Sequence, residues 1–153
     1  MDINKELEKI AYKISKPFCY QCYEIAPTGC CQHCHSDDLM RILDGVGCEY
    51  GIDWIIEQYL KDNLTLINID ESFEDFCREI YPETTQVGWM ELNTVELMKD
   101  NDPISWNIAK SEWIDNQACD EIAITFDNGF SYYWIYEIEK LILENKSKNR
   151  EVG

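Results

Sequence analysis

Two C-x2-C pairs constrain the fold of this chain more than any other feature. Cys19 and Cys22 are separated by two residues, and eight residues further on Cys31 and Cys34 repeat the spacing. A C-x2-C turn presents two thiolates from one tight loop, and Zn²⁺ prefers four soft ligands in a tetrahedron. We therefore expect one structural zinc ion bound by Cys19, Cys22, Cys31 and Cys34.

Three residues beside the predicted ligands are alternatives to one member of the set. They are Cys30, His33 and His35. A disulfide cluster and free thiols are the other interpretations. Disulfides need an oxidising compartment, and the polar, charged start of the sequence lacks the apolar segment of a signal peptide. Zinc is therefore the preferred interpretation.

The segment 18–43 resembles the short zinc ribbons found in many unrelated proteins, with the four cysteines at the ligand positions. This resemblance implies a structural zinc on a small β-hairpin scaffold and no particular activity. The chain departs from the usual pattern at two positions. Such turns usually carry glycine after the second cysteine, whereas this chain has Tyr23 and His35 there.

The sequence predicts no enzymatic activity. A catalytic zinc keeps an open coordination position with a base nearby, and four thiolates leave none. A cysteine nucleophile needs a histidine within reach, and both histidines (His33 and His35) belong to the cysteine-rich segment. This leaves Cys48, Cys77 and Cys119 without a partner, and Cys77 falls on the apolar side of its predicted helix.

The charge of the chain indicates what it binds. It has 30 acidic and 13 basic residues, a net charge of −17, and residues 37–139 hold 24 of the acids against five bases. Such a chain repels phosphate backbones and anionic membranes, and its self-repulsion costs stability. We therefore expect a protein partner with a basic surface, such as a nucleic-acid-binding complex. The predicted partner-binding residues are Asp70, Glu71, Glu74 and Asp75, on the polar side of one predicted helix.

Hydrophobic periodicity predicts an α+β protein. Helices are expected over 3–14, 52–60, 70–81, 94–99, 103–116 and 135–142, and strands over 39–43 and 85–90. Asp70 and Asp102 are the expected N-caps of two of these helices. The dipeptide Asn128-Gly129 predicts a hairpin between 121–127 and 130–134.

These elements suggest an N-terminal helix and zinc ribbon followed by a compact, helix-rich acidic domain with a C-terminal β-hairpin and a final helix. The expected ranges are 1–43 for the helix and ribbon, 44–145 for the acidic domain and 146–153 for a polar tail. No apolar run approaches the roughly 18 residues of a membrane span, so a cytoplasmic location is expected.

In size, acidity and lack of catalytic groups, the chain is similar in kind to the small anti-CRISPR and antirestriction proteins of phages and mobile elements. This resemblance transfers no residues. It implies a DNA-mimic inhibitor that blocks a nucleic-acid-binding defence complex in the bacterial host cytoplasm. The alternative is a zinc-ribbon adaptor that docks onto a cytosolic transcription or replication complex. Candidate interface aromatics are Trp89, Trp113, Tyr132 and Tyr133.

Overall fold

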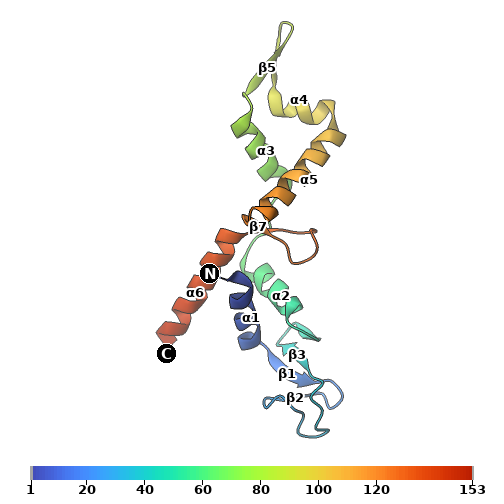
Figure 1. Cartoon of the computed structure of the whole chain (residues 1–153), viewed down its shortest axis with the longest axis vertical. Coiled ribbons are helices and arrows are strands. Elements are labelled where there is room, and N and C mark those ends of the chain that lie inside the picture. The colour runs from blue at the N-terminus through green and yellow to red at the C-terminus, as the bar shows by residue number, and fades with distance from the viewer. Residues whose placement is uncertain (1, 153) are drawn as a thin grey trace. The chain divides into compact units, whose positions relative to one another are not determined.

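The computed structural model describes residues 2–152 of the chain, with side chains as far as residue 148 (Figure 1). These residues form helices and short antiparallel strands, which confirms the predicted α+β class. The helices are α1 (Ile3–Ile14), α2 (Asp53–Asn63), α3 (Ile69–Ile80), α4 (Thr94–Asn101), α5 (Pro103–Cys119) and α6 (Ile135–Val152). The strands are β1 (Lys16–Cys19), β2 (Glu24–Ile25), β3 (Met40–Leu43), β4 (Gly47–Glu49), β5 (Thr84–Val87), β6 (Met90–Asn93), β7 (Ala123–Ile124) and β8 (Tyr133–Trp134). None of the helices described is long and apolar enough to cross a membrane.

The chain divides into two compact units that do not follow the predicted ranges. Unit 1 comprises the residues up to Thr65 and those from Tyr136 onward, and unit 2 comprises Leu66–Ile135. Unit 1 is larger than the predicted range 1–43 because α2 packs on α1 and α6 is joined to the same helix by an ion pair. An ion pair joins Lys146 Nζ to Glu6 at 3.1 Å. Helix α6 also continues to Val152, through most of the segment expected to be a polar tail.

Unit 1 combines three helices with a four-stranded antiparallel sheet in the order β2-β1-β3-β4. Each helix buries apolar side chains. These are Leu7 and Ile10 on α1, Ile55, Ile56 and Leu60 on α2, and Ile138 and Ile142 on α6. Arg41 of β3 ties the sheet to the end of α1, because its guanidinium donates to Ser15 Oγ at 2.7 Å and to the Tyr12 carbonyl at 3.1 Å.

Unit 2 is built around α3 and α5. Phe73 and Cys77 of α3 are buried against Trp106 of α5, with the Phe73 and Trp106 rings 4.7 Å apart in an edge arrangement. Asp102 caps α5 by accepting from the Ser105 amide, as predicted. The predicted cap Asp70 is wrong, because α3 begins at Ile69 and its N-cap is Asn68, whose side chain accepts from the Glu71 amide.

The two hairpins of unit 2 differ from the sequence prediction. The predicted hairpin exists, but β7 and β8 have two residues each, and the connection 125–132 folds around the Asp127 carboxylate. That carboxylate accepts from the Ser131 amide at 2.9 Å and from the hydroxyls of Thr125 and Ser131. The predicted strand 85–90 is instead a hairpin of β5 and β6, whose turn is Gly88-Trp89.

Candidate functional site

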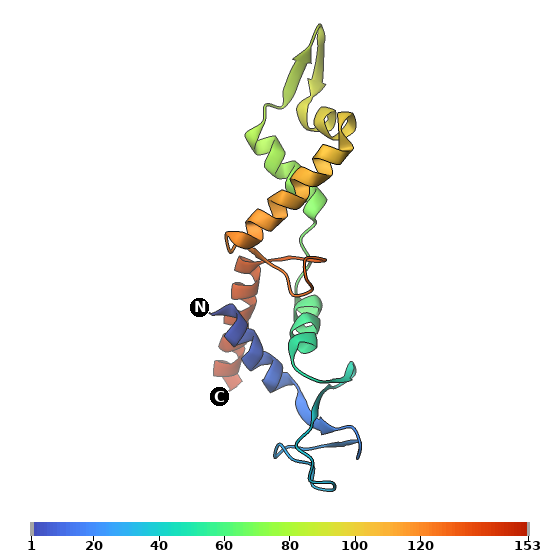
Figure 2. The ribbon, with the colours of Figure 1, turned by 45° about the vertical axis from the view of Figure 1, so that its right-hand side comes forward.

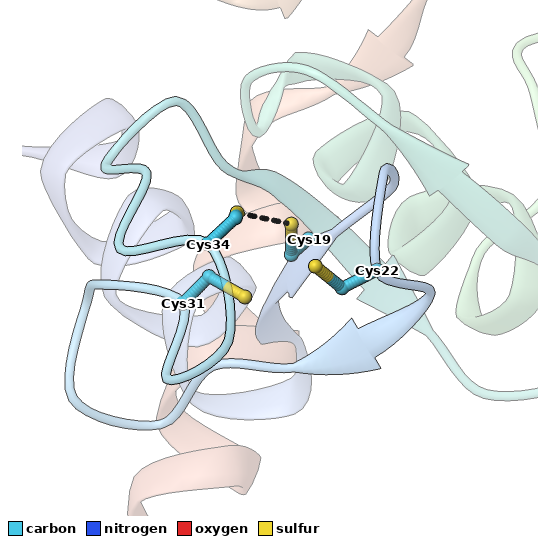
Figure 3. A group of neighbouring side chains, drawn as sticks. All are labelled: Cys19, Cys22, Cys31 and Cys34. Atoms are coloured by element: carbon cyan, nitrogen blue, oxygen red, sulfur yellow. Dashed lines mark hydrogen bonds between the residues drawn. The ribbon is translucent and has the colours of Figure 1, made fainter.

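The four predicted zinc ligands lie together in unit 1. Cys19 ends β1, Cys22 follows in the turn before β2, and Cys31 and Cys34 belong to the loop before β3. Figure 3 shows their side chains converging on one point. The four Sγ atoms lie within 4.8 Å of one another, and those of Cys19 and Cys34 are 3.7 Å apart. A tetrahedral zinc site with Zn–S bonds of about 2.3 Å needs sulfur atoms about 3.8 Å apart. The cluster therefore fits a metal ion.

The two C-x2-C turns have similar backbone geometry. The amide of Cys22 donates to Cys19 Sγ, and the amides of His33 and Cys34 donate to Cys31 Sγ. The residue that follows each pair has a positive φ, 55° at Tyr23 and 59° at His35. These are the two positions at which a glycine is usual. The chain therefore adopts the expected turn with side chains in a left-handed conformation that costs them energy.

The sulfur atoms influence one another's protonation. Amide donors from Cys34 and His33 lower the pKa of Cys31 to about 6. The pKa of Cys22 is raised to about 12, first because its thiol donates toward the Cys31 sulfur. At Cys19 the Cys22 amide favours the thiolate, but burial and the thiols of Cys31 and Cys34 outweigh it, so that pKa is raised as well. Four thiolates this close repel one another unless a cation lies between them.

The three alternative ligands lie outside this group. Among the described residues, the four cysteines alone make up the cluster whose ligand atoms lie within 4.8 Å. His33 Nε2 instead lies 2.7 Å from a Glu24 carboxylate oxygen. The Cys30 thiol donates to the carbonyl of His35 at 3.2 Å. The donor set is therefore four cysteines positioned to bind a metal ion.

Three of the four predicted partner-binding carboxylates of α3 have cationic partners within unit 2. Asp70 pairs with Lys110 of α5, and Glu74 pairs with Lys99 of α4. Arg78 contacts Asp75 at 3.1 Å and Glu74 at 3.3 Å. The Lys110 ammonium holds the pKa of Asp70 below its usual range. The fourth member, Glu71, accepts from the Asn68 side-chain amide at 3.4 Å.

This pairing leaves the rest of unit 2 strongly acidic. Residues 66–135 contain 15 acidic residues and three basic ones, a net charge of −12. The three bases are Arg78, Lys99 and Lys110, and all three contact α3 carboxylates. The twelve other acids of unit 2 therefore have no lysine or arginine of their own unit left to neutralise them.

The candidate interface aromatics fall into two groups. Tyr132 and Tyr133 are buried, each 6% exposed, and Trp113 packs between Phe73 and Trp134, so these three belong to the core. Trp89 is 91% exposed at the tip of the β5–β6 hairpin. Of the four candidates, Trp89 is thus the one that is available to a partner.

Of the cysteines outside the cluster, Cys77 was predicted to lie in the core. Cys77 is buried, and burial raises the pKa of its thiol. It lines one wall of a groove of about 320 Å³ between α3, α4 and α5, where its neighbours include Phe73, Met98 and Trp106. Both histidines lie in unit 1, in the metal-binding segment. The predicted place of Cys77 in the core is confirmed.

Comparison with curated proteins finds a similarity to the transcription elongation factor SPT6 of Gibberella zeae, 26% identical over 83 residues. The matched segment is 54% of this chain and 6% of that protein, so the chain spans a small fraction of the relative. No protein-family model and no solved structure matches the chain.

Proposed function

We propose that this chain is a zinc-stabilised, non-catalytic protein-binding module whose acidic unit 2 binds a basic surface on a partner protein. The observation that carries the proposal is the distribution of charge in unit 2. Its three cations all contact carboxylates of α3, and the twelve other acids have no cation of their own unit to pair with. A net charge of −12 on 70 residues costs stability through self-repulsion, and a basic partner relieves that cost.

Zinc is the metal proposed for the four-cysteine cluster. Soft thiolate ligands in a tetrahedral arrangement favour Zn²⁺ over the hard cations, and four protein ligands leave no open position for a substrate. The ion would then hold the β2-β1-β3-β4 sheet together. Purified protein should contain one zinc per chain by elemental analysis. Zinc-free protein that retains the far-UV and NMR spectra of unit 1 would contradict this role.

The first candidate activity is inhibition of a nucleic-acid-binding complex. Carboxylates that protrude from a rigid unit resemble a row of phosphates, and they compete for a groove lined by lysine and arginine. This candidate shifts the expected contact away from Asp70, Glu74 and Asp75 of α3, which are already paired with cations. Unpaired acids near the β5–β6 hairpin and α4 are better placed for it, among them Glu83, Glu91 and Glu96.

A salt-dependent capture experiment tests the proposal. Tagged full-length protein is used to capture partners from nuclease-treated cell lysate at 50 mM and 500 mM salt, and the bound proteins are identified by mass spectrometry. We expect a nucleic-acid-binding protein that is lost at high salt and displaced by added DNA or RNA. No reproducible partner in either salt would overturn the proposal.

A matched pair of variants locates the acidic contact. The triple variant E83Q/E91Q/E96Q removes unpaired carboxylates, and the triple variant D70N/E74Q/D75N removes the same number of paired ones. If phosphate mimicry carries the binding, the first variant should weaken it more than the second. Equal loss in both would place the contact elsewhere or spread it over the whole unit.

The second candidate activity is that of an adaptor, favoured by the similarity to a transcription elongation factor. A zinc ribbon and an acidic unit in one chain would dock onto a transcription or replication complex without displacing nucleic acid. In the capture experiment this candidate predicts a salt-resistant complex that still contains its nucleic acid. That result would exclude the inhibitor and leave the adaptor.

A further inference from the structure

The β5–β6 hairpin of unit 2 projects a tryptophan into solvent. The strands pair in register from Thr84 opposite Asn93 to Val87 opposite Met90, and Gly88 and Trp89 form a two-residue turn. Gly88 has a φ of +63° and Trp89 has a negative one, the pattern of a type II′ turn. In Figures 1 and 2 the hairpin extends beyond α4, at the end of unit 2 away from β7. The turn therefore fixes the backbone that carries the indole ring.

The two faces of the hairpin differ in polarity. Alternation along paired strands puts Val87 and Met90 on the same face as Thr85 and Leu92. At the end of the hairpin next to α4, the hydroxyls of Thr85 and Thr94 share a hydrogen bond of 2.7 Å. Val87 and Met90 remain about half exposed beside the fully exposed indole of Trp89. The tip of the hairpin is thus an apolar cap.

The chain segment that carries this cap holds acidic residues and no cation. The twenty residues 79–98 contain four acids and no lysine or arginine. One of the acids, Glu91, lies on the opposite face of the hairpin and accepts from the Thr84 hydroxyl at 2.9 Å. The two bases that border this segment, Arg78 and Lys99, both contact Glu74 of α3. An apolar cap with a purely acidic border is complementary to an apolar pocket with a basic rim.

We propose that the β5–β6 hairpin is the part of the chain that inserts into its partner, with Trp89 filling an apolar pocket and Glu83, Glu91 and Glu96 meeting basic residues around that pocket. The occupant of this surface is therefore a protein with a basic rim and an apolar pocket. This inference rests on the proposed function and names the surface that performs it. Tryptophan is one of the residues enriched at the centre of such contacts, where surrounding groups exclude water from it.

The test compares Trp89→Ala with Phe130→Ala in the full-length protein. Phe130 is a matched control, because it is an aromatic side chain of the same unit, 89% exposed in the 125–132 loop. The two residues lie in different hairpins, and α5, a helix of 17 residues about 25 Å long, separates them along the chain. Neither ring is packed in a core, so both variants should keep the melting temperature of the wild-type protein.

The partner that wild-type protein captures is purified, and its affinity for each variant is measured at 50 mM and 500 mM salt. At 50 mM salt, where the wild-type complex is expected to form, we expect Trp89→Ala to weaken binding at least about 30-fold, the loss typical of a central interface residue. Phe130→Ala should bind like the wild type, and E83Q/E91Q/E96Q should lose affinity mainly at low salt. A benzophenone side chain placed at position 89 should cross-link to the partner, whereas one at position 130 should not.

The alternative outcomes separate this inference from the proposed function. Equal binding of Trp89→Ala and the wild type would overturn the inference, while the captured partner would still support the acidic binding module. Loss of binding in Phe130→Ala alone would move the contact to the other end of unit 2 and also overturn it. Capture of no partner by the wild type would overturn both.

Discussion

Replacing His35 by glycine should strengthen the metal site, although the residue is not a ligand. His35 has a φ of 59°, a left-handed conformation that costs an L-residue about 1–2 kcal/mol and glycine almost nothing. Glycine also loses more backbone entropy on folding, which costs about 0.5–1 kcal/mol. The hydrogen bonds at this position use the His35 backbone, so they survive the change. The folded, metal-bound state should gain about 0.5–1 kcal/mol.

Tyr23 occupies the equivalent position in the other turn, with a φ of 55°, and offers a matched comparison. Its ring lies 5.1 Å from that of Phe18 in an edge arrangement. Such a contact contributes about 0.5–1.5 kcal/mol, which offsets the strain that glycine would relieve. Tyr23→Gly should therefore leave the stability of the site unchanged or lower it. Replacement by glycine is therefore expected to stabilise the metal-bound state at His35 and not at Tyr23.

Competition with a zinc chelator measures the effect directly. His35→Gly should tighten zinc binding by about two- to fivefold, the factor that corresponds to 0.5–1 kcal/mol. His35→Ala is the control, because it removes the imidazole and keeps a β-carbon in the left-handed conformation. If His35→Gly bound zinc no more tightly than His35→Ala, strain at this position would not limit the site, and the reasoning would be refuted.

Three further predictions concern the ligand set, an ion pair and the core. Cys34→Ser should lose bound zinc in elemental analysis, whereas Cys30→Ser should keep one ion per chain, because the Cys30 thiol lies outside the cluster. Lys110→Ala should raise the pKa of Asp70 in an NMR titration. Since that pKa is lowered in the folded state, the pair stabilises the protein above the unfolded carboxyl pKa of about 3.9 and its contribution is lost as the pH falls through the folded value. At pH 7 its loss should cost at most about 1 kcal/mol, because both side chains reach solvent. Leu60→Ala should lower the free energy of unfolding by about 2–5 kcal/mol in urea titrations, since Leu60 is 0% exposed.

The metal site was predictable from sequence because its determinants are local. A C-x2-C turn fixes the relative positions of two sulfur atoms within four residues, and two such turns need only a short hairpin to meet. The helices were predictable for the same reason, since periodicity and caps such as Asp102 lie within a few residues of each other. The departures at Tyr23 and His35 did not change the turn, because the metal-binding geometry of the cysteines outweighs a strain of this size.

The β5–β6 hairpin was harder to predict. The sequence 85–90 contains no Asn-Gly or Asp-Gly pair, and its turn instead uses a glycine at the first central position followed by a tryptophan. The reverse error occurred at Asn128-Gly129, where a strong turn dipeptide predicted long strands. There the Asp127 carboxylate organises the connection by hydrogen bonds, and the strands shrink to two residues each.

The charge of α3 shows why a polar helix face does not by itself identify a binding surface. Periodicity correctly placed Asp70 and Glu74 away from the buried Phe73 and Cys77, but their partners come from other helices, Lys110 being forty residues away in sequence. Because unit 2 has three cations in all, concentrating them on α3 determines where its negative potential remains. The uncompensated part includes the segment 79–98, which also carries the exposed indole of Trp89.

If the acids were there for solubility alone, nothing would favour a large apolar side chain among them, since an exposed tryptophan lowers solubility. A binding surface requires both, because the carboxylates accelerate encounter with a basic partner and the indole slows its dissociation. The two contributions are separable by experiment: removing carboxylates should mainly lower the association rate and its salt dependence, and removing the indole should mainly raise the dissociation rate.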